Sequence, residues 1–180
     1  MPAYLTDLLL VVFAFSLIAA YHGWLLRRIR TRPMTTAVSL TRHVRKQWVE
    51  MAMAERRDVL AVQTLRNSTM AATFLASMAM LLALGILSVA ATQEQAVRVG
   101  ELLTVFGAGG PTYALIKLLV LAGVFLFAFF NFALALRYFN HTGFQIALPP
   151  GQDPWVTPEG VADGVNRGGC ITPWACGAIT

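Results

Sequence analysis

Charged residues are scarce in this chain. They make up 13% of its 180 residues, about half of the ~25% that is usual in soluble domains. Hydrophobic residues make up 57%, and the mean hydropathy is +0.61. The apolar residues are concentrated in long runs that cannot close around one aqueous core, so the composition excludes an ordinary soluble enzyme.

Residues that carry catalysis or bind metals are also few. The chain has three His, nine acidic residues and two Cys, and it contains no HExxH motif, no cluster of two His with a carboxylate and no Gly-flanked Ser. The glycines at 107, 109 and 110 lack the Lys and Ser or Thr of a phosphate loop, and with Pro111 they indicate a turn into a helix. We therefore expect no enzymatic activity, no catalytic residue, no metal site and no cofactor.

Three runs carry no formal charge at all: residues 8–26, 67–93 and 118–136. About 20 apolar residues in a helix span a hydrocarbon layer of ~30 Å. None of the runs alternates apolar with polar residues, which excludes membrane strands. The sequence predicts an all-α integral membrane protein with spans at about residues 5–26, 67–91 and 112–137.

The basic residues predict the orientation. Ten of the 14 Lys and Arg lie between the first and second runs, whereas residues 94–116 hold only Arg98. An excess of basic residues in a short loop marks the cytoplasmic side. We expect an integral membrane protein with its N-terminus outside and its 27–66 loop in the cytoplasm. The first run follows an acidic segment, which favours a retained anchor over a cleaved signal peptide.

The same basic loop has an amphipathic pattern. Apolar residues recur at helical spacings over residues 39–66, while most basic residues fall elsewhere around the helix; the apolar set is Leu40, Val44, Trp48, Met51, Val59 and Val62. Neither Gly nor Pro occurs between Pro33 and Gly85, so we expect this helix to continue unbroken into the second span. The alternative is a helix that lies in the membrane interface with Trp48 at headgroup level.

Small residues predict a packing face on the second span, where they repeat about every four residues at Ser68, Ala72, Ala76, Ala79 and Ala83. The face could meet the chain's own helices or a second copy.

Polar residues predict an inner-leaflet layer formed by His22, Arg66, Asn67, Asn131, Arg137, Asn140 and His141. They are either anchors and helix–helix hydrogen bonds or the lining of a polar cavity that binds an anion, a headgroup or a proton.

The C-terminal segment differs from the rest. Residues 149–180 contain five prolines and many glycines, so we predict a disordered tail after a membrane domain of residues 1–148. Residues 154–159 could still begin a short interfacial turn or helix at Thr157.

Several blocks carry a resemblance to a known family. They are residues 58–77, the Tyr21-His22 pair with the basic block and Trp48, the Phe129-Phe130-Asn131-Phe132 stretch, and residues 136–141. Over about residues 5–148 the chain resembles an uncharacterised multi-pass membrane family of bacteria and plants, known only as a domain of unknown function. The resemblance implies a four-helix bundle in full-length members and a location in the bacterial inner membrane, and it points to no particular activity. It also draws attention to Arg66, Asn67, Asn131, Arg137, Asn140 and His141, which lie on the family's pattern.

The resemblance also implies a fourth span, preceded by a segment that reads roughly His-His-Thr-Leu-Gly-Met-Arg-Gly-Tyr-Tyr. Residues 170–180, back-translated and read one base earlier, are compatible with that segment at every codon. We expect that residues from about Cys170 onward arise from a frameshift that removes the last helix, which makes Cys170 and Cys176 accidental. The alternative is a metal or disulfide pair. No His lies nearby to complete a metal site, and a cytoplasmic location disfavours a disulfide.

The function expected from these features is that of a non-enzymatic membrane scaffold or accessory subunit. Its expected partners are the lipid bilayer, anionic lipid headgroups, and either a membrane protein or further copies of itself. Nucleic acid is not expected, because the basic patch lies beside a membrane and no reading module is recognisable. The alternative function is a small oligomeric channel or transporter built around the polar inner-leaflet site.

Overall fold

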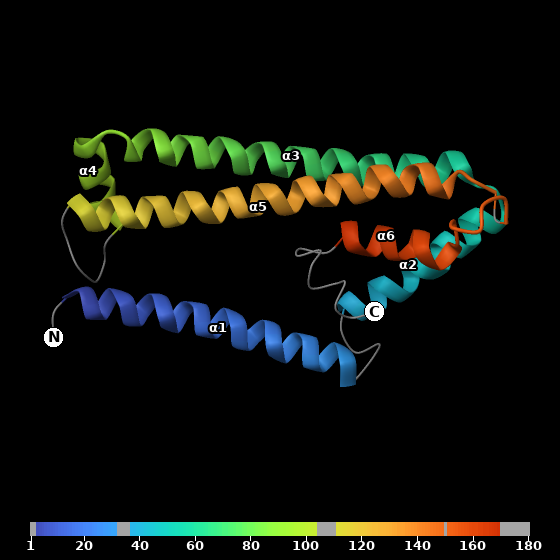
Figure 1. Ribbon diagram of the computed structural model, residues 1–180, viewed down its shortest axis with the longest axis horizontal. Coiled ribbons are helices and arrows are strands. Elements are labelled where there is room, and N and C mark those ends of the chain that lie inside the picture. Colours follow the sequence, from blue (N-terminus) through green and yellow to red (C-terminus); the bar gives the residue numbers. More distant parts are fainter. Residues whose placement is uncertain (1–2, 32–36, 104–110, 150, 170–180) are drawn as a thin grey trace. The chain divides into compact units, whose positions relative to one another are not determined.

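The structure is a computed structural model that describes residues 3–31, 37–103, 111–149 and 151–169. Within these ranges the chain is all-helical, as the sequence predicts, with six helices and no strand (Figure 1). The helices are α1 (Ala3–Thr31), α2 (Ala37–Ala54), α3 (Asp58–Ala90), α4 (Gln93–Leu103), α5 (Pro111–Ile146) and α6 (Pro158–Gly168).

Two of the helices, α3 and α5, are long and apolar enough to cross a membrane. They contain the predicted second and third spans, and α5 begins at Pro111 as expected, because proline suits the first position of a helix. The predicted first span falls in α1, whose apolar stretch Val11–Leu25 is shorter than the membrane-spanning lengths of α3 and α5. The sequence did not predict α4, which the structure places in the connection between α3 and α5.

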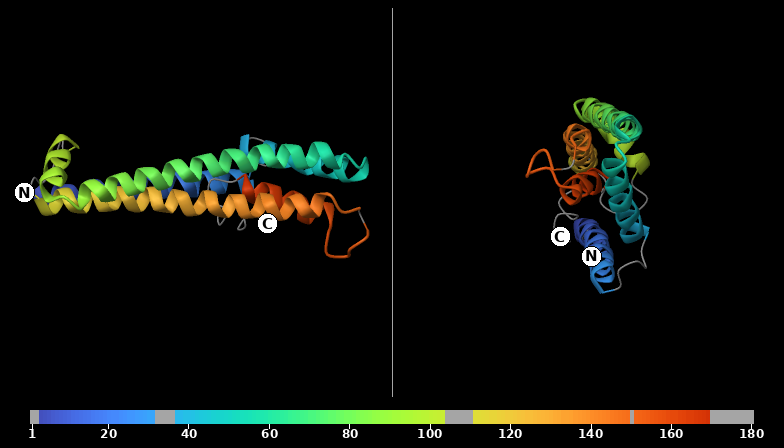
Figure 2. Two further views of the ribbon diagram at one scale, coloured as in Figure 1. Left: turned by 90° about the horizontal axis from the view of Figure 1, so that it is seen from above. Right: turned by 90° about the vertical axis from the view of Figure 1, so that its right-hand side faces the viewer.

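The chain divides into two units, and α3 and α5 contribute to both. One unit holds Met1–Leu25 with Met78–Ala128, and the other holds Leu26–Ser77 with Phe129–Thr180. In each unit the segments of α3 and α5 lie side by side (Figures 1 and 2). In the first unit, α4 comes so close to α5 that a β-carbon on Gly100 would collide with Ala114.

The alanines of the predicted small-residue face of α3 are buried, whereas Ser68 is only partly buried. Ala72, Ala76, Ala79 and Ala83 are all buried, while most of the large apolar side chains between them are exposed. On α5 a matching row begins with Ala114, Leu118 and Ala122. Two helices with small residues on their facing sides can approach closely, which leaves their bulky residues for the surroundings.

The expectation of one unbroken helix from residue 39 into the second span is wrong. α2 ends at Ala54 and α3 begins at Asp58. Arg56 between them has the left-handed φ of 53°, and the Arg57 backbone N–H donates to the Ala52 carbonyl at 3.0 Å. This is the hydrogen bond of a Schellman helix end, in which glycine usually occupies the left-handed position. The break escaped prediction because an arginine holds that position.

The buried face of α2 is not the apolar face that the sequence of residues 39–66 predicted. Val49, Ala52 and Met53 are the buried residues of α2. The residues that formed the predicted apolar face are largely exposed, among them Leu40, Val44, Met51, Val59 and Val62. α2 therefore has one apolar face that is covered and a second, on its other side, that is not.

The prediction of a disordered tail is wrong for residues 158–168, which form α6. The helix begins where the sequence allowed a start: Thr157 is the N-cap, its Oγ1 accepts a hydrogen bond from the Gly160 N–H at 3.1 Å, and Pro158 follows. Val161, Ala162 and Val165 are buried, so an apolar face offsets the cost of ordering this segment. Residues 170–180, with both cysteines and the expected frameshift, lie outside the described residues.

Candidate functional site

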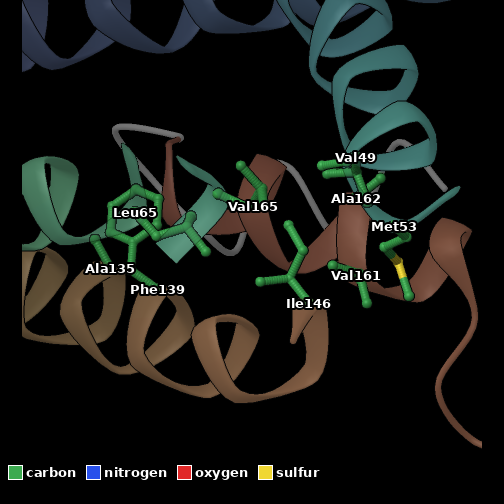
Figure 3. Packing of buried hydrophobic residues seen from close by; sticks show 11 residues of the cluster. Val49, Met53, Leu65, Ala135, Phe139, Ile146, Val161, Ala162 and Val165 are labelled. Carbon is green, nitrogen blue, oxygen red and sulfur yellow. The ribbon is translucent and has the colours of Figure 1, made fainter. Parts of the chain in front are cut away.

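Four helical segments share one hydrophobic core in the second unit (Figure 3). We call α2, residues 58–65 of α3, residues 135–146 of α5 and α6 together the cap. The core residues of the cap are Val49, Ala52, Met53, Ala61, Leu65, Ala135, Phe139, Ile146, Val161, Ala162 and Val165. Trp48 and Val156 pack against this core from its edge.

Glycine lets α6 approach α5 closely. A β-carbon built on Gly164 would collide with the Thr142 hydroxyl, and one built on Gly168 would lie 2.8 Å from Cε1 of Phe139. Thr142 and Phe139 are themselves buried on α5. The α6 backbone therefore lies directly against buried side chains of α5, with no room for larger residues at these two positions.

Ion pairs join the other side of α6 to α2. The Lys46 ammonium lies 2.6 Å from Oε1 of Glu159, and Nη2 of Arg42 lies 3.6 Å from Oδ1 of Asp163. The partners are four residues apart on each helix and run in opposite directions, so α2 and α6 are antiparallel. Lys46 also lies 3.9 Å from Glu50 on its own helix.

The Lys46–Glu159 pair, the shorter of the two, shifts the pKa of both of its residues. The hydrogen bond and the charge of Glu159 raise the pKa of Lys46, with Glu50 adding to the effect. The same hydrogen bond and the charge of Lys46 lower the pKa of Glu159. Both groups are exposed, so solvent and salt screen the interaction, and its main role is to set the register of α6 on α2.

Three arginines lie along the contact between α2 and α6. Nε of Arg167 lies 2.8 Å from Oδ2 of Asp163, the carboxylate that also faces Arg42. The hydrogen bond and charge of Asp163 raise the pKa of Arg167, and a hydrogen bond to the Tyr138 hydroxyl adds to this. Arg45 is half-buried and lies against Gly169 at the end of α6, where burial lowers its pKa.

The sequence-predicted polar residues do not share one environment. Asn131 is buried, with 8% of its surface exposed. Arg66, Asn67, Arg137, Asn140 and His141 lie in the same unit and are exposed. His22 lies in the other unit and is also exposed, and its Nδ1 is 3.0 Å from the Ile18 carbonyl of its own helix. A polar layer assembled from these side chains stays a prediction.

Four of the six side-chain hydroxyl groups of α3 form hydrogen bonds within the helix itself. Thr64, Ser68, Thr73 and Ser77 each donate to the carbonyl four residues earlier, at 2.9 to 3.3 Å. A polar group in hydrocarbon needs such an internal partner, because lipid offers none. This arrangement suits a helix surrounded by lipid better than one that lines a polar cavity.

The residues of α6 are the part of the cap that the sequence analysis missed. Two signals were present: the glycines at 160, 164 and 168 repeat every four residues, and Glu159 and Asp163 repeat the spacing of Arg42 and Lys46. Each signal is weak alone, since a Gly-rich segment usually indicates a loop. Within the described residues, no three His, Cys, Asp or Glu side chains gather as a metal site requires.

A family model described as "Protein of unknown function, DUF599" matches residues 9–175 of the chain. The chain belongs to this family. The DUF599 match contains α2 to α6 completely, so the cap is part of the region shared with the family rather than an appendage to it. A search of the curated proteins and a search of the solved structures found no match. The DUF599 description assigns no activity.

Proposed function

We propose that this chain is a three-span protein of the cell membrane, with α1, α3 and α5 as its spans, and that it acts as a non-enzymatic scaffold or accessory subunit. Its N-terminus is outside, and the cap is in the cytoplasm. The observation that carries the proposal is the exposed apolar stripe of α2, formed by Leu40, Val44 and Met51 on the face turned away from α6.

The contact between α2 and α6 supports two membrane crossings. α2 precedes α3, and α6 follows α5, so the two short helices lie on the same side only if both long helices cross or neither does. The Lys46–Glu159 and Arg42–Asp163 pairs join α2 to α6 directly. Large apolar residues such as Phe74 and Leu81 on α3 and Phe127 on α5 are exposed, which favours lipid as their surroundings.

The lengths of the two helices support a cap outside the hydrocarbon. α3 has 33 residues and α5 has 36, which correspond to about 50 and 54 Å at 1.5 Å per residue. The hydrocarbon core takes up ~30 Å of this, so roughly 20 Å of each helix lies outside the hydrocarbon. The basic residues of α2 favour the cytoplasm as the location of that end.

The exposed stripe supports a protein partner. Leu40, Val44 and Met51 are 40% or more exposed although they belong to a folded cap. Aligned apolar side chains on a helix in water are typical of a docking face for another protein. Because the opposite face of α2 is already covered by α6, a partner could bind the stripe without disturbing the core.

Cysteine labelling tests the topology. In a Cys170→Ser, Cys176→Ser background, Gln95→Cys on α4 is expected to react with a membrane-impermeant maleimide from outside the cell. Thr41→Cys on α2 is expected to react only after permeabilisation. Both positions are exposed. Labelling of the two from the same side would overturn the proposed topology.

Extraction of the tagged chain from its native membrane in mild detergent tests the scaffold. Native mass spectrometry should find a heteromeric assembly that is lost in Val44→Gln, Met51→Gln and retained in Leu102→Gln, an exposed apolar residue of α4. A chain that always purifies alone contradicts the proposal.

One observation favours the channel or transporter as a second candidate. Asn131 is a buried polar residue within an otherwise apolar stretch of α5, and polar residues at such depth often mark a pathway. This function requires a homo-oligomer and solute flux in liposomes that Asn131→Leu or Arg66→Gln abolishes. The internally bonded hydroxyls of α3 favour the scaffold instead.

A further inference from the structure

The arginine cluster of the cap has more positive charge than its surroundings neutralise. Arg42 and Arg167 share the carboxylate of Asp163, one on each oxygen, at 3.6 and 2.8 Å. Among the described residues, no carboxylate pairs with the guanidinium of Arg45. Arg42 and Arg167 therefore share one carboxylate, and Arg45 lies against Gly169, two residues after Arg167, so the three guanidinium groups exceed that carboxylate by two positive charges.

The end of α6 offsets only part of this excess. Arg45 lies against Gly169, the C-cap residue of α6, and a helix C-terminus carries the equivalent of about half a negative charge. Arg45 is nonetheless half-buried, and a guanidinium stays charged at any physiological pH. A charge withdrawn from water without a full counter-charge is costly, so an anion at this place would be stabilised.

We propose that Arg42, Arg45 and Arg167 bind a phosphate group. The planar fork of a guanidinium matches the oxygens of phosphate and allows two parallel hydrogen bonds from each side chain. Asp163 acts as a positioning residue, since it holds Arg42 and Arg167 on either side of itself. The Tyr138 hydroxyl, already hydrogen-bonded to Arg167, fixes that guanidinium from the α5 side.

The phosphate can come from a lipid headgroup or from a soluble phosphate. Tyr138 directly follows the predicted end of the third span at residue 137, so in the proposed topology the cluster lies close to the inner headgroups. This argument for the lipid source rests on the proposed function. The binding of soluble phosphate does not, so a failure of the phosphate site and a failure of the scaffold proposal are distinguishable.

The soluble source is tested on the full chain purified in a neutral detergent without anionic lipid. The midpoint of thermal unfolding is measured in sodium phosphate and in sodium chloride of equal ionic strength. We expect phosphate to raise the midpoint by several degrees. Isothermal titration with phosphate should show binding that is roughly 10- to 100-fold weaker in Arg45→Gln and Arg167→Gln.

The lipid source is tested in phosphate-free buffer with nanodiscs of phosphatidylcholine. One set contains phosphatidic acid, and the other contains the same fraction of oleate, which supplies negative charge without phosphate. A midpoint that rises only with phosphatidic acid assigns the site to a headgroup. Arg98→Gln on α4, an exposed arginine paired with Glu94 in the other unit, is the matched control and should respond as the wild type does.

Two results would overturn the proposal. One is a wild-type chain that responds neither to phosphate nor to phosphatidic acid. The other is an Arg45→Gln chain whose midpoint falls by the same amount in every condition while its phosphate response persists, since Arg45 would then only cap α6. If Arg45→Gln does not fold, Arg45→Lys keeps the charge without the fork and is expected to bind phosphate several-fold more weakly.

Discussion

The Cα of Gly168 lies so close to Phe139 that a β-carbon added there would be 2.8 Å from Cε1 and 3.0 Å from Cδ1 of the ring. Phe139 is buried within the core of the cap, so the ring has little freedom to move away. The contact joins the last turn of α6 to the middle of the cap's α5 segment. Close backbone approach, rather than a large side chain on α6, therefore fixes this end of the helix.

Gly168→Ala is expected to destabilise the cap by about 1–3 kcal/mol, because the new methyl group overpacks a filled core. The matched control is Gly143→Ala on α5, where a β-carbon would meet nothing within 4 Å; alanine there should be neutral or stabilise by up to about 1 kcal/mol. Chemical unfolding in detergent, followed by circular dichroism, measures both. Equal stability of the two variants would contradict the close packing of α6 on α5.

Thr157→Ala is expected to loosen the first turn of α6. It removes the Oγ1 that accepts the Gly160 N–H at 3.1 Å, and loss of an N-cap typically costs about 0.5–2 kcal/mol. Hydrogen exchange of the α6 amides should become correspondingly faster, while Thr157→Ser, which keeps the hydroxyl, should exchange as the wild type does. Unchanged exchange in the alanine variant would show that core packing alone holds α6.

The long helices were predictable because a local property, an uncharged apolar run, specifies them. The buried alanines of α3 followed from spacing in the same way.

The cap was not predictable, since it depends on pairings far apart in sequence: Lys46 with Glu159, and Phe139 with Gly168. Glycine and proline suggested disorder for residues 149–169, whereas the structure uses them as a helix start and a contact surface. For the candidate site, burial of Asn131 was consistent with its place in an apolar run, but the convergence of Arg42, Arg45 and Arg167 required the tertiary fold.

Arg56→Gly is expected to stabilise the junction between α2 and α3. Arg56 has a φ of 53°, a conformation that costs a residue with a side chain roughly 1–2 kcal/mol and glycine almost nothing. Glycine also makes the unfolded chain more flexible, which offsets part of this effect. The net gain in the free energy of unfolding should therefore be up to about 1 kcal/mol. Arg57→Gly removes the same charge at a residue without positive φ and should destabilise. Chemical unfolding measures the stability of both variants, which should change in opposite directions.

The docking of α6 on α2 is expected to depend on pH at both extremes. The pKa of Glu159 is lowered from 4.5 by its hydrogen bond to Lys46, so this carboxylate supports docking above pH 4.5, and its contribution is lost as the pH falls through the lowered pKa. The pKa of Lys46 is raised from 10.5 by the same bond, so its contribution is present below pH 10.5 and is lost as the pH rises through the raised pKa. Hydrogen exchange of α6, corrected for the intrinsic pH dependence, should therefore be constant between these limits and faster outside them.

High salt should flatten this dependence of the exchange rate on pH, because both groups are exposed. In Glu159→Gln the loss of protection on the acid side should diminish, and a profile identical to that of the wild type would show that the Lys46–Glu159 pair does not hold α6 in register.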